Sequence, residues 1–595
     1  MHSQYGRSPH PGDDERSGQG WHPGGSPWST APGSPPPVAP TTGGTYGRAS
    51  VPLNTVGPDG AQKEKEPWVA GPSSPAVGGE VPAGAVTPPR MPAVRPVASG
   101  HEQPGVPAAG QRRASVASRK PVIASVAAVL VLVLGVGVAA LVRPGPIKNL
   151  LAGGSTPSPA RATLAPDPEP TPVLVAASGG TQPDPARIKV ALDPLVSSAA
   201  LGTTVHAAVL DVASGQVLYA RDADVPTTPA STTKLLTAAT VLASRGPGYR
   251  IGTTAVAGRE PGEVVLVGGG DPTLSVDGNQ LFPGAARLDR LAGQVKKALG
   301  ATPVTSVAID TSLFSGPETG TGWASDDISP LGQVARIQPL MTNGGRIKPI
   351  HNEHGGDPRF ADPALSAGKA FAKLLGAPAA SVKRDKAPEA PAASAPASAA
   401  AAPIAPGTRL GLVQSAPLVQ ITDWMLEQSD NTLAEVMARQ VALANGKPAT
   451  FDGATDAIIA KLRQMGLPGD EADLYDGSGL SRHNGISPTL LTQVLALAAS
   501  GKLPEITGML GGLPVAGWSG TLADRFVSPR PNQVGQGVVR AKTGTLSGVN
   551  TMAGQLVTKD GRLLVFAIMA SGSANAFTAK AALDKVPARL VTCGC

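Results

Sequence analysis

Three short motifs combine residue types that can carry out nucleophilic catalysis. They are Ser231-Thr232-Thr233-Lys234, Ser429-Asp430-Asn431 and Lys542-Thr543-Gly544, in that order along the chain. A serine and a lysine one helical turn apart lie on the same face of a helix, so Lys234 can reach the Ser231 hydroxyl. A lysine that is partly desolvated and close to another cation has a lowered pKa and can accept the serine proton. We therefore predict that Ser231 is a nucleophile and that Lys234 is its base.

The sequence around Ser231 places it at or near the start of a helix. Pro229 and Ala230 precede it, and the apolar residues that follow at helical spacing are Leu235, Leu236, Ala239 and Leu242. Unpaired backbone N–H groups and the positive end of the helix dipole gather at such a terminus, which favours a site where negative charge develops. Taken alone, the motif also fits an ordinary serine N-cap followed by a surface lysine.

The second and third motifs are expected to complete the site. We expect Ser429 to relay a proton and Asn431 to contact substrate through its amide, although Ser-Asp-Asn alone also fits a helix break or cap. Lys542-Thr543-Gly544 is predicted on a strand that lines a cleft. There Lys542 can hold a substrate carboxylate, and the small Gly544 lets the substrate backbone approach as an added strand. By itself this motif also fits a strand-end turn with a solvated lysine.

Two decoy matches show that context must decide between such motifs. Ser366-Ala367-Gly368-Lys369 also fits the first pattern, and Ser573-Ala574-Asn575 fits the loose form of the second. However, Ser366 lies inside a helical pattern rather than at its start, and Ser573 follows the third motif instead of preceding it. Neither decoy is predicted to be functional.

The N-terminal part of the chain has a composition that does not form a packed core. Residues 1–110 are rich in Pro, Gly, Ser and Ala and predict a disordered cytoplasmic tail. Residues 111–143 hold a basic flank and 21 uncharged residues from Val122 to Val142, about enough for a transmembrane helix. The stronger positive flank precedes this run, so we expect a single-pass anchor with the catalytic part outside the cell membrane. A cleaved signal peptide is the alternative, but its apolar region is shorter and rarely follows so long a tail.

The remaining chain is predicted to contain one folded part with an insertion. Residues 144–187 form an extracytoplasmic linker, 188–250 and 407–595 the catalytic domain, 251–386 an inserted domain, and 387–406 an Ala/Pro-rich disordered loop. Hairpins are predicted for Thr203–Leu210 with Gln216–Ala220 and, around an Asp-Gly turn, for Met552–Thr558 with Arg562–Met569. Helical patterns cover 417–444 and 579–590, with Pro587 expected to interrupt the second.

Charge, cysteine and histidine content exclude several function classes. The net charge of +7 does not come from one basic stripe and accompanies no nucleic-acid-binding motif. The two cysteines, Cys593 and Cys595, are predicted to lie in a frayed tail, with intermolecular pairing as the alternative. The core therefore has neither a disulfide framework nor a thiolate metal site. His351-Asn352-Glu353-His354 lacks zinc-protease spacing. The chain also has no Gly-x-Ser-x-Gly elbow, which argues against an α/β-hydrolase.

The three motifs in this order are those of serine β-lactamases and penicillin-binding proteins. More specifically, the chain resembles the D-alanyl-D-alanine carboxypeptidase/endopeptidase family of class C, low-molecular-mass penicillin-binding proteins (DacB or type 4, peptidase S13), from about Ile188 to the C-terminus. The segments that carry the resemblance are Pro229–Ala238, Leu266–Leu274 with Gly269-Gly270-Asp271-Pro272, Ser415-Ala416-Pro417-Leu418, Ser429–Glu435, Asp476-Gly477-Ser478-Gly479-Leu480-Ser481-Arg482, and Gly520-Thr521-Leu522 before Arg525.

This resemblance implies an α+β fold of the β-lactamase/DD-peptidase type, with an antiparallel sheet flanked by helices, a helical subdomain and an insertion between the first two motifs. It implies a serine-type D-Ala-D-Ala carboxypeptidase, possibly also an endopeptidase, that acts through an acyl-enzyme at Ser231. The backbone N–H groups of Ser231 and Thr545 would form the oxyanion hole, and Lys542 and Thr543 would bind the terminal carboxylate. The partners would be peptidoglycan stem peptides and β-lactams, with no cofactor, no metal and no nucleic acid.

Two alternatives share this sequence pattern. One is a non-catalytic peptidoglycan-binding scaffold of the same fold, which the intact motifs argue against. The other is a serine β-lactamase, which would need a carboxylate for rapid deacylation. Because no such motif accompanies the three, penicillin is expected to acylate the enzyme and to remain bound.

Overall fold

The computed structural model describes residues 179–352, 356–390 and 404–593. The predicted cytoplasmic tail and the apolar run Val122–Val142 lie outside these residues, so they stay predictions. Within the described ranges, no helix is both long enough and apolar enough to cross a membrane. The first helix of the described residues, α3, spans Pro185–Val196 and is capped by Asp184, close to the predicted start of the folded part at Ile188.

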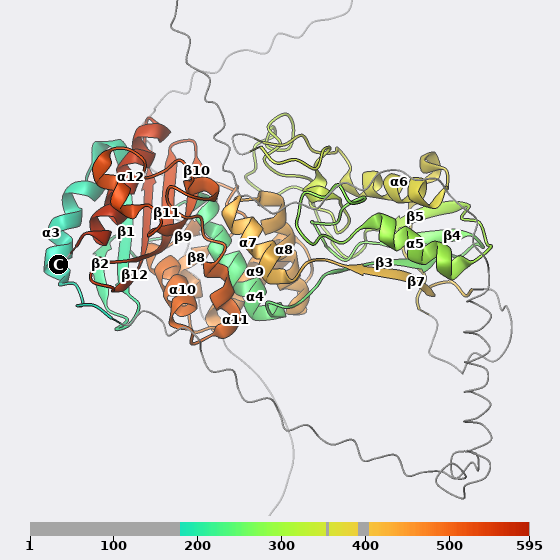
Figure 1. Cartoon of the computed structure of the whole chain (residues 1–595), viewed down its shortest axis with the longest axis horizontal. Coiled ribbons are helices and arrows are strands. Elements are labelled where there is room, and N and C mark those ends of the chain that lie inside the picture. Colours follow the sequence, from blue (N-terminus) through green and yellow to red (C-terminus); the bar gives the residue numbers. More distant parts are fainter. Residues whose placement is uncertain (1–178, 353–355, 391–403, 594–595) are drawn as a thin grey trace, which may run out of the picture. The chain divides into compact units, whose positions relative to one another are not determined.

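An antiparallel sheet of five strands, in the order β10-β11-β12-β1-β2, forms the base of the catalytic part (Figure 1). Its strands are β1 (Thr204–Asp211), β2 (Val217–Arg221), β10 (Arg540–Leu546), β11 (Val549–Val557) and β12 (Leu563–Ser571). Both predicted hairpins, β1–β2 and β11–β12, are confirmed. Pairing of β1 with β12, with Thr204 opposite Ser571, joins the beginning and the end of the folded chain in one sheet. Strand β10 is at the edge of the sheet. Its outer side is bonded at Ala541, whose N–H donates to the Pro514 carbonyl, and the residues after Ala541 can accept another strand.

Helices cover both faces of this sheet. On one face, α12 (Ala576–Val591) packs on β11 and on α3, and on the other, α10 (Pro488–Ser500) packs on β1 and β12. The expected interruption of the last helix at Pro587 is wrong, because α12 continues through it. Leu583, Val586 and Leu590 are buried in the core beneath the sheet, and this tertiary packing holds the helix together despite the lost backbone hydrogen bond.

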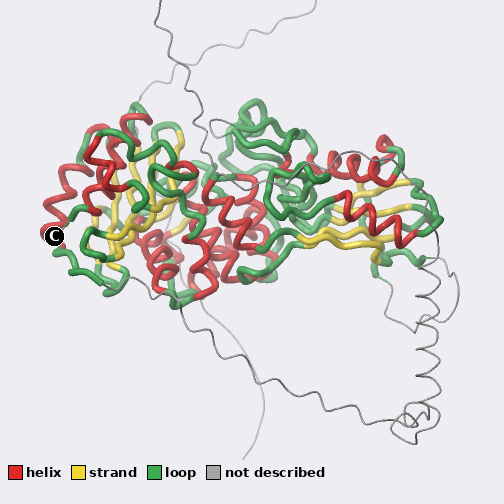
Figure 2. The backbone as a smooth tube through the Cα atoms, in the orientation of Figure 1, coloured by secondary structure: helices red, strands yellow, loops and turns green. Residues whose placement is uncertain are grey.

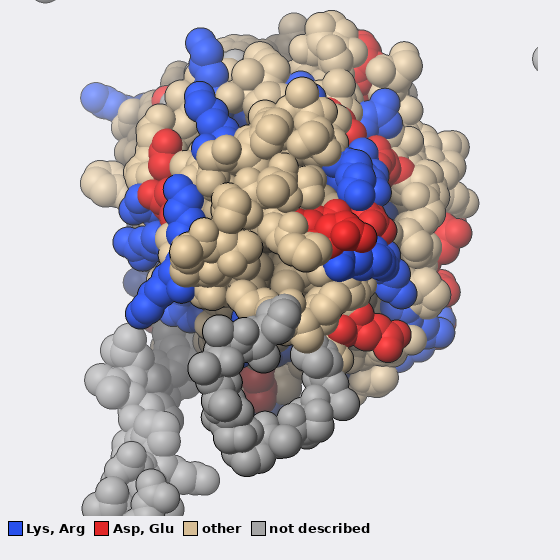
Figure 3. All heavy atoms as spheres, turned by 90° about the vertical axis from the view of Figure 1, so that its right-hand side faces the viewer, with Lys and Arg blue, Asp and Glu red and all other residues tan. Residues whose placement is uncertain are grey.

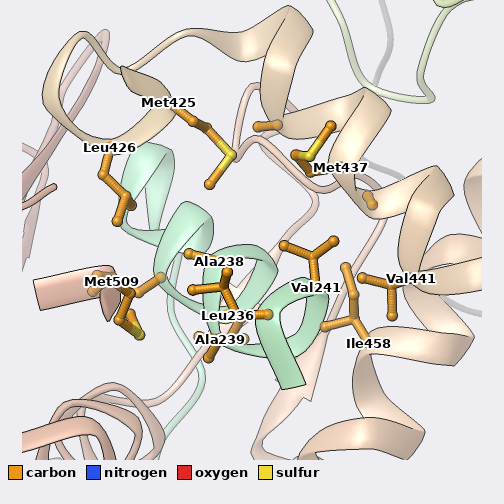
Figure 4. Close-up of a cluster of buried hydrophobic side chains, with 14 of the residues drawn as sticks. Leu236, Ala238, Ala239, Val241, Met425, Leu426, Met437, Val441, Ile458 and Met509 are labelled. Carbon is orange, nitrogen blue, oxygen red and sulfur yellow. The ribbon is translucent and has the colours of Figure 1, made fainter. Parts of the chain in front are cut away.

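Helix α4 (Lys234–Arg245) is the centre of the helical subdomain. Figure 4 shows its side chains meeting Met425 and Leu426 of α7 (Leu418–Glu427), Met437 and Val441 of α8 (Asn431–Ala444), Ile458 of α9 (Phe451–Gln464), and Met509 after the short α11 (Pro504–Thr507). The four predicted apolar residues of α4 are buried, but so is every residue from Lys234 to Leu242. A helix surrounded on all sides buries its whole circumference, so the prediction of a single apolar face was incomplete.

The inserted part is built on a second five-stranded sheet, in the order β6-β5-β4-β3-β7 (Figure 2). Its strands are β3 (Gly252–Ala257), β4 (Glu263–Val267), β5 (Ser306–Asp310), β6 (Lys383–Arg384) and β7 (Arg409–Gln414). Pairings β4–β5 and β5–β6 are parallel, and α5 (Leu288–Leu299) and α6 (Pro363–Leu375) pack on one face. The sheet extends beyond the predicted insertion of residues 251–386, because β7 pairs with β3.

Charged side chains of both signs are mixed on the surface of the inserted part, and the C-terminal residues as far as Cys593 pack onto the core. On the face that the inserted part presents, Lys and Arg side chains are interspersed with Asp and Glu side chains rather than gathered in one basic stripe (Figure 3). Near the C-terminus, the expected frayed tail is wrong as far as Cys593, which is 2% exposed. Cys593 is held there because it packs in the core beneath the first sheet.

Candidate active site

A cleft of about 780 Å³ brings residues of all three motifs together. Its floor holds Ser231, Ser429 and Asn431, and one wall is strand β10, through Thr543 and Thr545. The cleft is also lined by Trp323, Asp327 and Gln333 of the inserted part and by Gly479, Leu480 and Arg482. The three motifs, up to 311 residues apart in sequence, therefore converge on one cleft, whereas neither Ser366 nor Ser573 of the decoys lines it.

Ser231 lies in a single 3₁₀ turn, Ala230–Thr233, that leads directly into α4. The preceding Ala230 has a positive φ of 47°, a conformation that costs energy for a residue with a Cβ. Backbone carbonyls of this turn are held by neighbouring elements, since Thr551 donates to the Pro229 carbonyl at 2.8 Å. The predicted position of Ser231 at a helix start is confirmed, and the turn projects its side chain into the cleft.

Lys234 connects the nucleophile to the second motif. Its Nζ donates to Ser231 Oγ at 3.0 Å, to Asn431 Oδ1 at 2.6 Å and to the Ser478 carbonyl at 2.7 Å. An amide oxygen and a backbone carbonyl can only accept, so two of the three ammonium hydrogens are committed to them. Loss of a proton from Lys234 therefore leaves its lone pair facing the Ser231 hydroxyl, which is the arrangement that a general base requires.

Burial lowers the proton affinity of Lys234. The side chain is fully buried, and desolvation lowers the pKa of Lys234 to about 8, against the opposing effect of the carboxylates of Asp476, Glu435 and Asp430. Glu435 is itself buried, and its burial together with the neighbouring Asp476 raises the pKa of Glu435 to about 7. Desolvation thus brings Lys234 within reach of its neutral form at physiological pH, while the neighbouring carboxylates act in the opposite sense.

Lys542 is buried beneath Ser429. Its Nζ donates to Ser429 Oγ at 2.9 Å and to the Thr543 carbonyl at 2.7 Å. Burial and the nearby charge of Lys234 hold the pKa of Lys542 well below its ordinary range. Lys542 is on strand β10 as predicted, but it is absent from the residues that line the cleft. Its direct contact with a substrate carboxylate stays a prediction, because in this geometry Ser429 lies between Lys542 and the cleft.

Gly544 allows strand β10 to approach the turn that holds Ser231, whereas the sequence had predicted that it lets the substrate backbone approach β10. A Cβ at this position would meet Thr551 Oγ1 first, and it would also lie 2.8 Å from the Pro229 carbonyl oxygen and 2.9 Å from the Ser231 nitrogen. The small residue thus allows strand β10 to pack against the nucleophile turn. An added substrate strand would instead lie along the open edge of β10, in the plane of the sheet.

Several functional candidates were not predicted from the sequence. Glu435 follows Asn431 by one helical turn on α8, and that spacing is the signal that could have identified it. Thr521 donates to or accepts from Thr543, with the two hydroxyl oxygens 2.7 Å apart in the cleft. Trp323 donates through Nε1 to Asp476 at 2.9 Å, which joins the inserted part to the loop that holds Lys234. No sequence pattern links residues so distant along the chain.

Within the part of the chain that the structure describes, no group of three potential metal ligands lies together. His351, from the segment considered for metal binding, faces Asp357 at 3.3 Å. His483 follows the cleft-lining Arg482 but packs its ring against Tyr475. Neither histidine is brought to Ser231.

Comparisons with known proteins agree with this geometry. Residues 188–395 and 361–590 match the sequence profile of the D-Ala-D-Ala carboxypeptidase 3 (S13) family. A carboxypeptidase of Mycobacterium tuberculosis is 38% identical over 392 residues, covering 65% of this chain and 80% of that protein. The carboxypeptidase DacB of Mycolicibacterium smegmatis is 38% identical over 391 residues, with 65% and 80% coverage.

Among solved structures, penicillin-binding protein 4 (dacB) of Haemophilus influenzae has a similar fold. The two align with a TM-score of 0.50 at 21% sequence identity, and the alignment covers 68% of this chain and 98% of that one. The α+β fold with an antiparallel sheet that the sequence predicted is thereby confirmed.

Proposed function

The chain belongs to the D-Ala-D-Ala carboxypeptidase 3 (S13) family, and we propose that Ser231 is the nucleophile through which it acts as a serine-type D-Ala-D-Ala carboxypeptidase. The substrates are peptidoglycan stem peptides that end in D-Ala-D-Ala. The observation that carries the proposal is the hydrogen bond from the buried Lys234 to Ser231, at the floor of a cleft that all three motifs reach.

Acylation begins with Lys234 in its neutral form. Lys234 takes the proton from Ser231 as Oγ attacks the carbonyl carbon of the D-Ala-D-Ala peptide bond. The carbonyl oxygen becomes an oxyanion, for which the backbone N–H groups of Ser231 and Thr545 are the donors, each worth about 3 kcal/mol. The C–N bond then breaks, and the leaving D-alanine amine takes the proton that Lys234 received from Ser231. The Ser429 hydroxyl, predicted as a relay, is hydrogen-bonded to Lys542 in this geometry. Water later hydrolyses the ester and releases Ser231.

Substrate orientation follows from the positive charges and the open strand at one end of the cleft. The terminal carboxylate of the substrate meets the hydroxyls of Thr543 and Thr521, with the charge of Lys542 behind Ser429. The peptide backbone pairs with the outer edge of β10. This arrangement supports recognition of a free C-terminal carboxylate, which is the feature that a carboxypeptidase requires.

Penicillin is expected to form a stable acyl-enzyme rather than to be turned over. The buried carboxylates nearest to the catalytic pair, Glu435 and Asp476, do not line the cleft. Each is committed to backbone donors of the loop beneath Lys234, Glu435 to Gly477 N and Asp476 to Gly479 N. Glu435 and Asp476 are therefore not placed to activate water on the substrate side. The carboxylates that do line the cleft, Asp326 and Asp327, belong to the inserted part.

The proposal is tested by incubating the full chain with a stem pentapeptide that ends in D-Ala-D-Ala and measuring free D-alanine. We expect turnover by the wild-type chain and none above background by Ser231→Ala. A cross-linked muropeptide in parallel distinguishes endopeptidase from carboxypeptidase activity. A folded wild-type chain that binds the peptide but releases no D-alanine would instead favour the scaffold.

We also propose an extracytoplasmic location for the catalytic part, held at the membrane by residues Val122–Val142. The apolar run and the basic residues before it support this proposal. Protease added to intact cells should then remove the catalytic part but spare the N-terminal tail. Recovery of the chain in the soluble fraction would contradict it.

A further inference from the structure

The start of helix α8 is held by the inserted part at three successive residues. Asp430, the N-cap of α8, accepts from Arg346 Nη2 at 2.8 Å. Asn431 donates through Nδ2 to the Gln333 carbonyl at 3.1 Å. Thr432 Oγ1 accepts from Ala335 N at 2.9 Å. The second motif is therefore attached from outside the catalytic sheet as well as from within it.

These contacts fix which end of the Asn431 amide faces the catalytic lysine. Because the Gln333 carbonyl can only accept, the Asn431 amide must turn its Nδ2 toward it. Oδ1 then points in the other direction, where it accepts from Lys234 Nζ at 2.6 Å. A reversed amide would set two donors against each other at Lys234.

Arg346 holds this arrangement through a buried ion-pair network. Its side chain is 2% exposed, and it binds Asp430 with Nη2 and Asp357 with Nε, the latter at 2.6 Å. Asp357 is also fixed by the Asn352 backbone N–H at 3.0 Å. Arg359 lies beside the network and donates to the carbonyls of Gly332 and Gly344. A guanidinium that binds two carboxylates in fixed directions sets the position of both.

We propose that Arg346 is a positioning residue for acylation: through Asp430 it fixes the start of α8, so that Asn431 holds Lys234 against Ser231. The inference rests on the proposed function. It assigns the inserted part a role in catalysis, because the residue that orients the second motif lies outside the catalytic sheet and its helices. Displacement of Asn431 by about 1 Å would lower the rate about 100-fold.

The test compares rate constants per competent active site in the full chain. The variants are Arg346→Met, Arg346→Lys and Asp357→Asn, and the matched control is Arg384→Met. Arg384 forms a bidentate ion pair with Asp362 in the same inserted part, at 2.8 and 2.9 Å, but contacts none of residues 430–432. The amount of stably bound fluorescent penicillin counts competent sites, and stopped-flow labelling gives the acylation rate constant of those sites.

We expect Arg346→Met to lower the acylation rate constant about 100-fold, with little change in the KM for a D-Ala-D-Ala peptide. Arg346→Lys should recover part of the rate, because it keeps the charge beside Asp430 but not the fork. Asp357→Asn should have a smaller effect, and Arg384→Met none.

Two results would overturn the proposal. One is a normal rate constant per competent site in Arg346→Met, even if fewer sites are competent, because a purely structural role changes the number of sites. The other is an equal loss in Arg384→Met. Failure of the proposed function itself would appear separately, as absence of labelling and of D-alanine release in the wild-type chain.

Discussion

Lys234 Nζ lies 3.0 Å from Ser231 Oγ, and the lysine side chain is fully buried while the serine reaches the cleft. The same nitrogen donates to Asn431 and to the Ser478 carbonyl, which leaves the direction toward Ser231 as the one that changes when Lys234 loses a proton. The chemistry of the site depends on this pair, and the following predictions test how its surroundings control it.

The acylation rate should rise with pH through the titration of Lys234. Burial lowers the pKa of Lys234 to about 8. Because the neutral lysine is the base, the rate should fall about tenfold per pH unit well below that value and level off above it. Pre-steady-state labelling with penicillin between pH 5 and 10 measures this profile. A rate that falls as pH rises through 8 would contradict the role of Lys234 as base.

Replacement of Glu435 should move that profile. The Glu435 carboxylate raises the pKa of Lys234, so Glu435→Gln should lower it and shift the rise in rate to lower pH. The amide retains an oxygen that can accept from Gly477 N. Glu471→Gln is the matched control, because Glu471 bonds Ser487 away from the cleft, and its profile should match the wild type. A shift to higher pH in Glu435→Gln would show that the charge acts in the opposite sense.

Gly544→Ala should impair acylation without a comparable loss of folding. The new methyl group would meet Thr551 Oγ1, which donates to the Pro229 carbonyl, and would also press on that carbonyl and on the Ser231 nitrogen. It therefore displaces the nucleophile turn. We expect the acylation rate to fall about 100-fold. Gly548→Ala, in the β10–β11 turn, is the comparison variant for a glycine-to-alanine change away from Ser231. There the nearest atom to the added Cβ is 3.9 Å away, although φ is 75°. Equal acylation rates in the two variants would contradict the proposed packing.

Arg562→Met should destabilise the fold while leaving each folded active site competent. Arg562 forms two hydrogen bonds with Asp211, at 2.7 and 2.6 Å, and the Asp211 side chain is 0% exposed. Leaving that carboxylate without its partner costs about 3 kcal/mol. Urea unfolding should report the loss in the free energy of unfolding, and the acylation rate per competent site should be unchanged. A fall in that rate would contradict the prediction, because it would show that the Arg562–Asp211 ion pair affects the geometry of the active site.

The sequence predicted the catalytic elements well because their signals are local. Alternating apolar residues on both sides of Asp-Gly specify the hairpin of β11 and β12. Ser231 and Lys234 lie one helical turn apart because of their spacing in the sequence, and this does not depend on how the helix packs. The apolar surroundings of α4 could not be predicted from one face, since they depend on four segments that meet only in the folded chain. The same limit applies to Arg346 and Asp430, which are 84 residues apart and whose ion pair no spacing rule indicates.

Gly544 and Lys542 illustrate a second limit. Their motif correctly predicted a strand beside the cleft, but it did not predict which residues each of them contacts. Gly544 faces the nucleophile turn, and Lys542 lies under Ser429 rather than in the open cleft. Residue type indicates what a group can do, whereas its partner depends on packing.

Covalent labelling of the full chain by fluorescent penicillin tests the central claim most directly. The wild-type chain should be labelled, Ser231→Ala should not, and Ser366→Ala, which removes the serine of the decoy motif in α6, should be labelled as the wild type is. A labelled peptide mapped to residues around Ser231 would complete the result. Labelling that survives in Ser231→Ala, or its absence in a folded wild-type chain, would contradict the account.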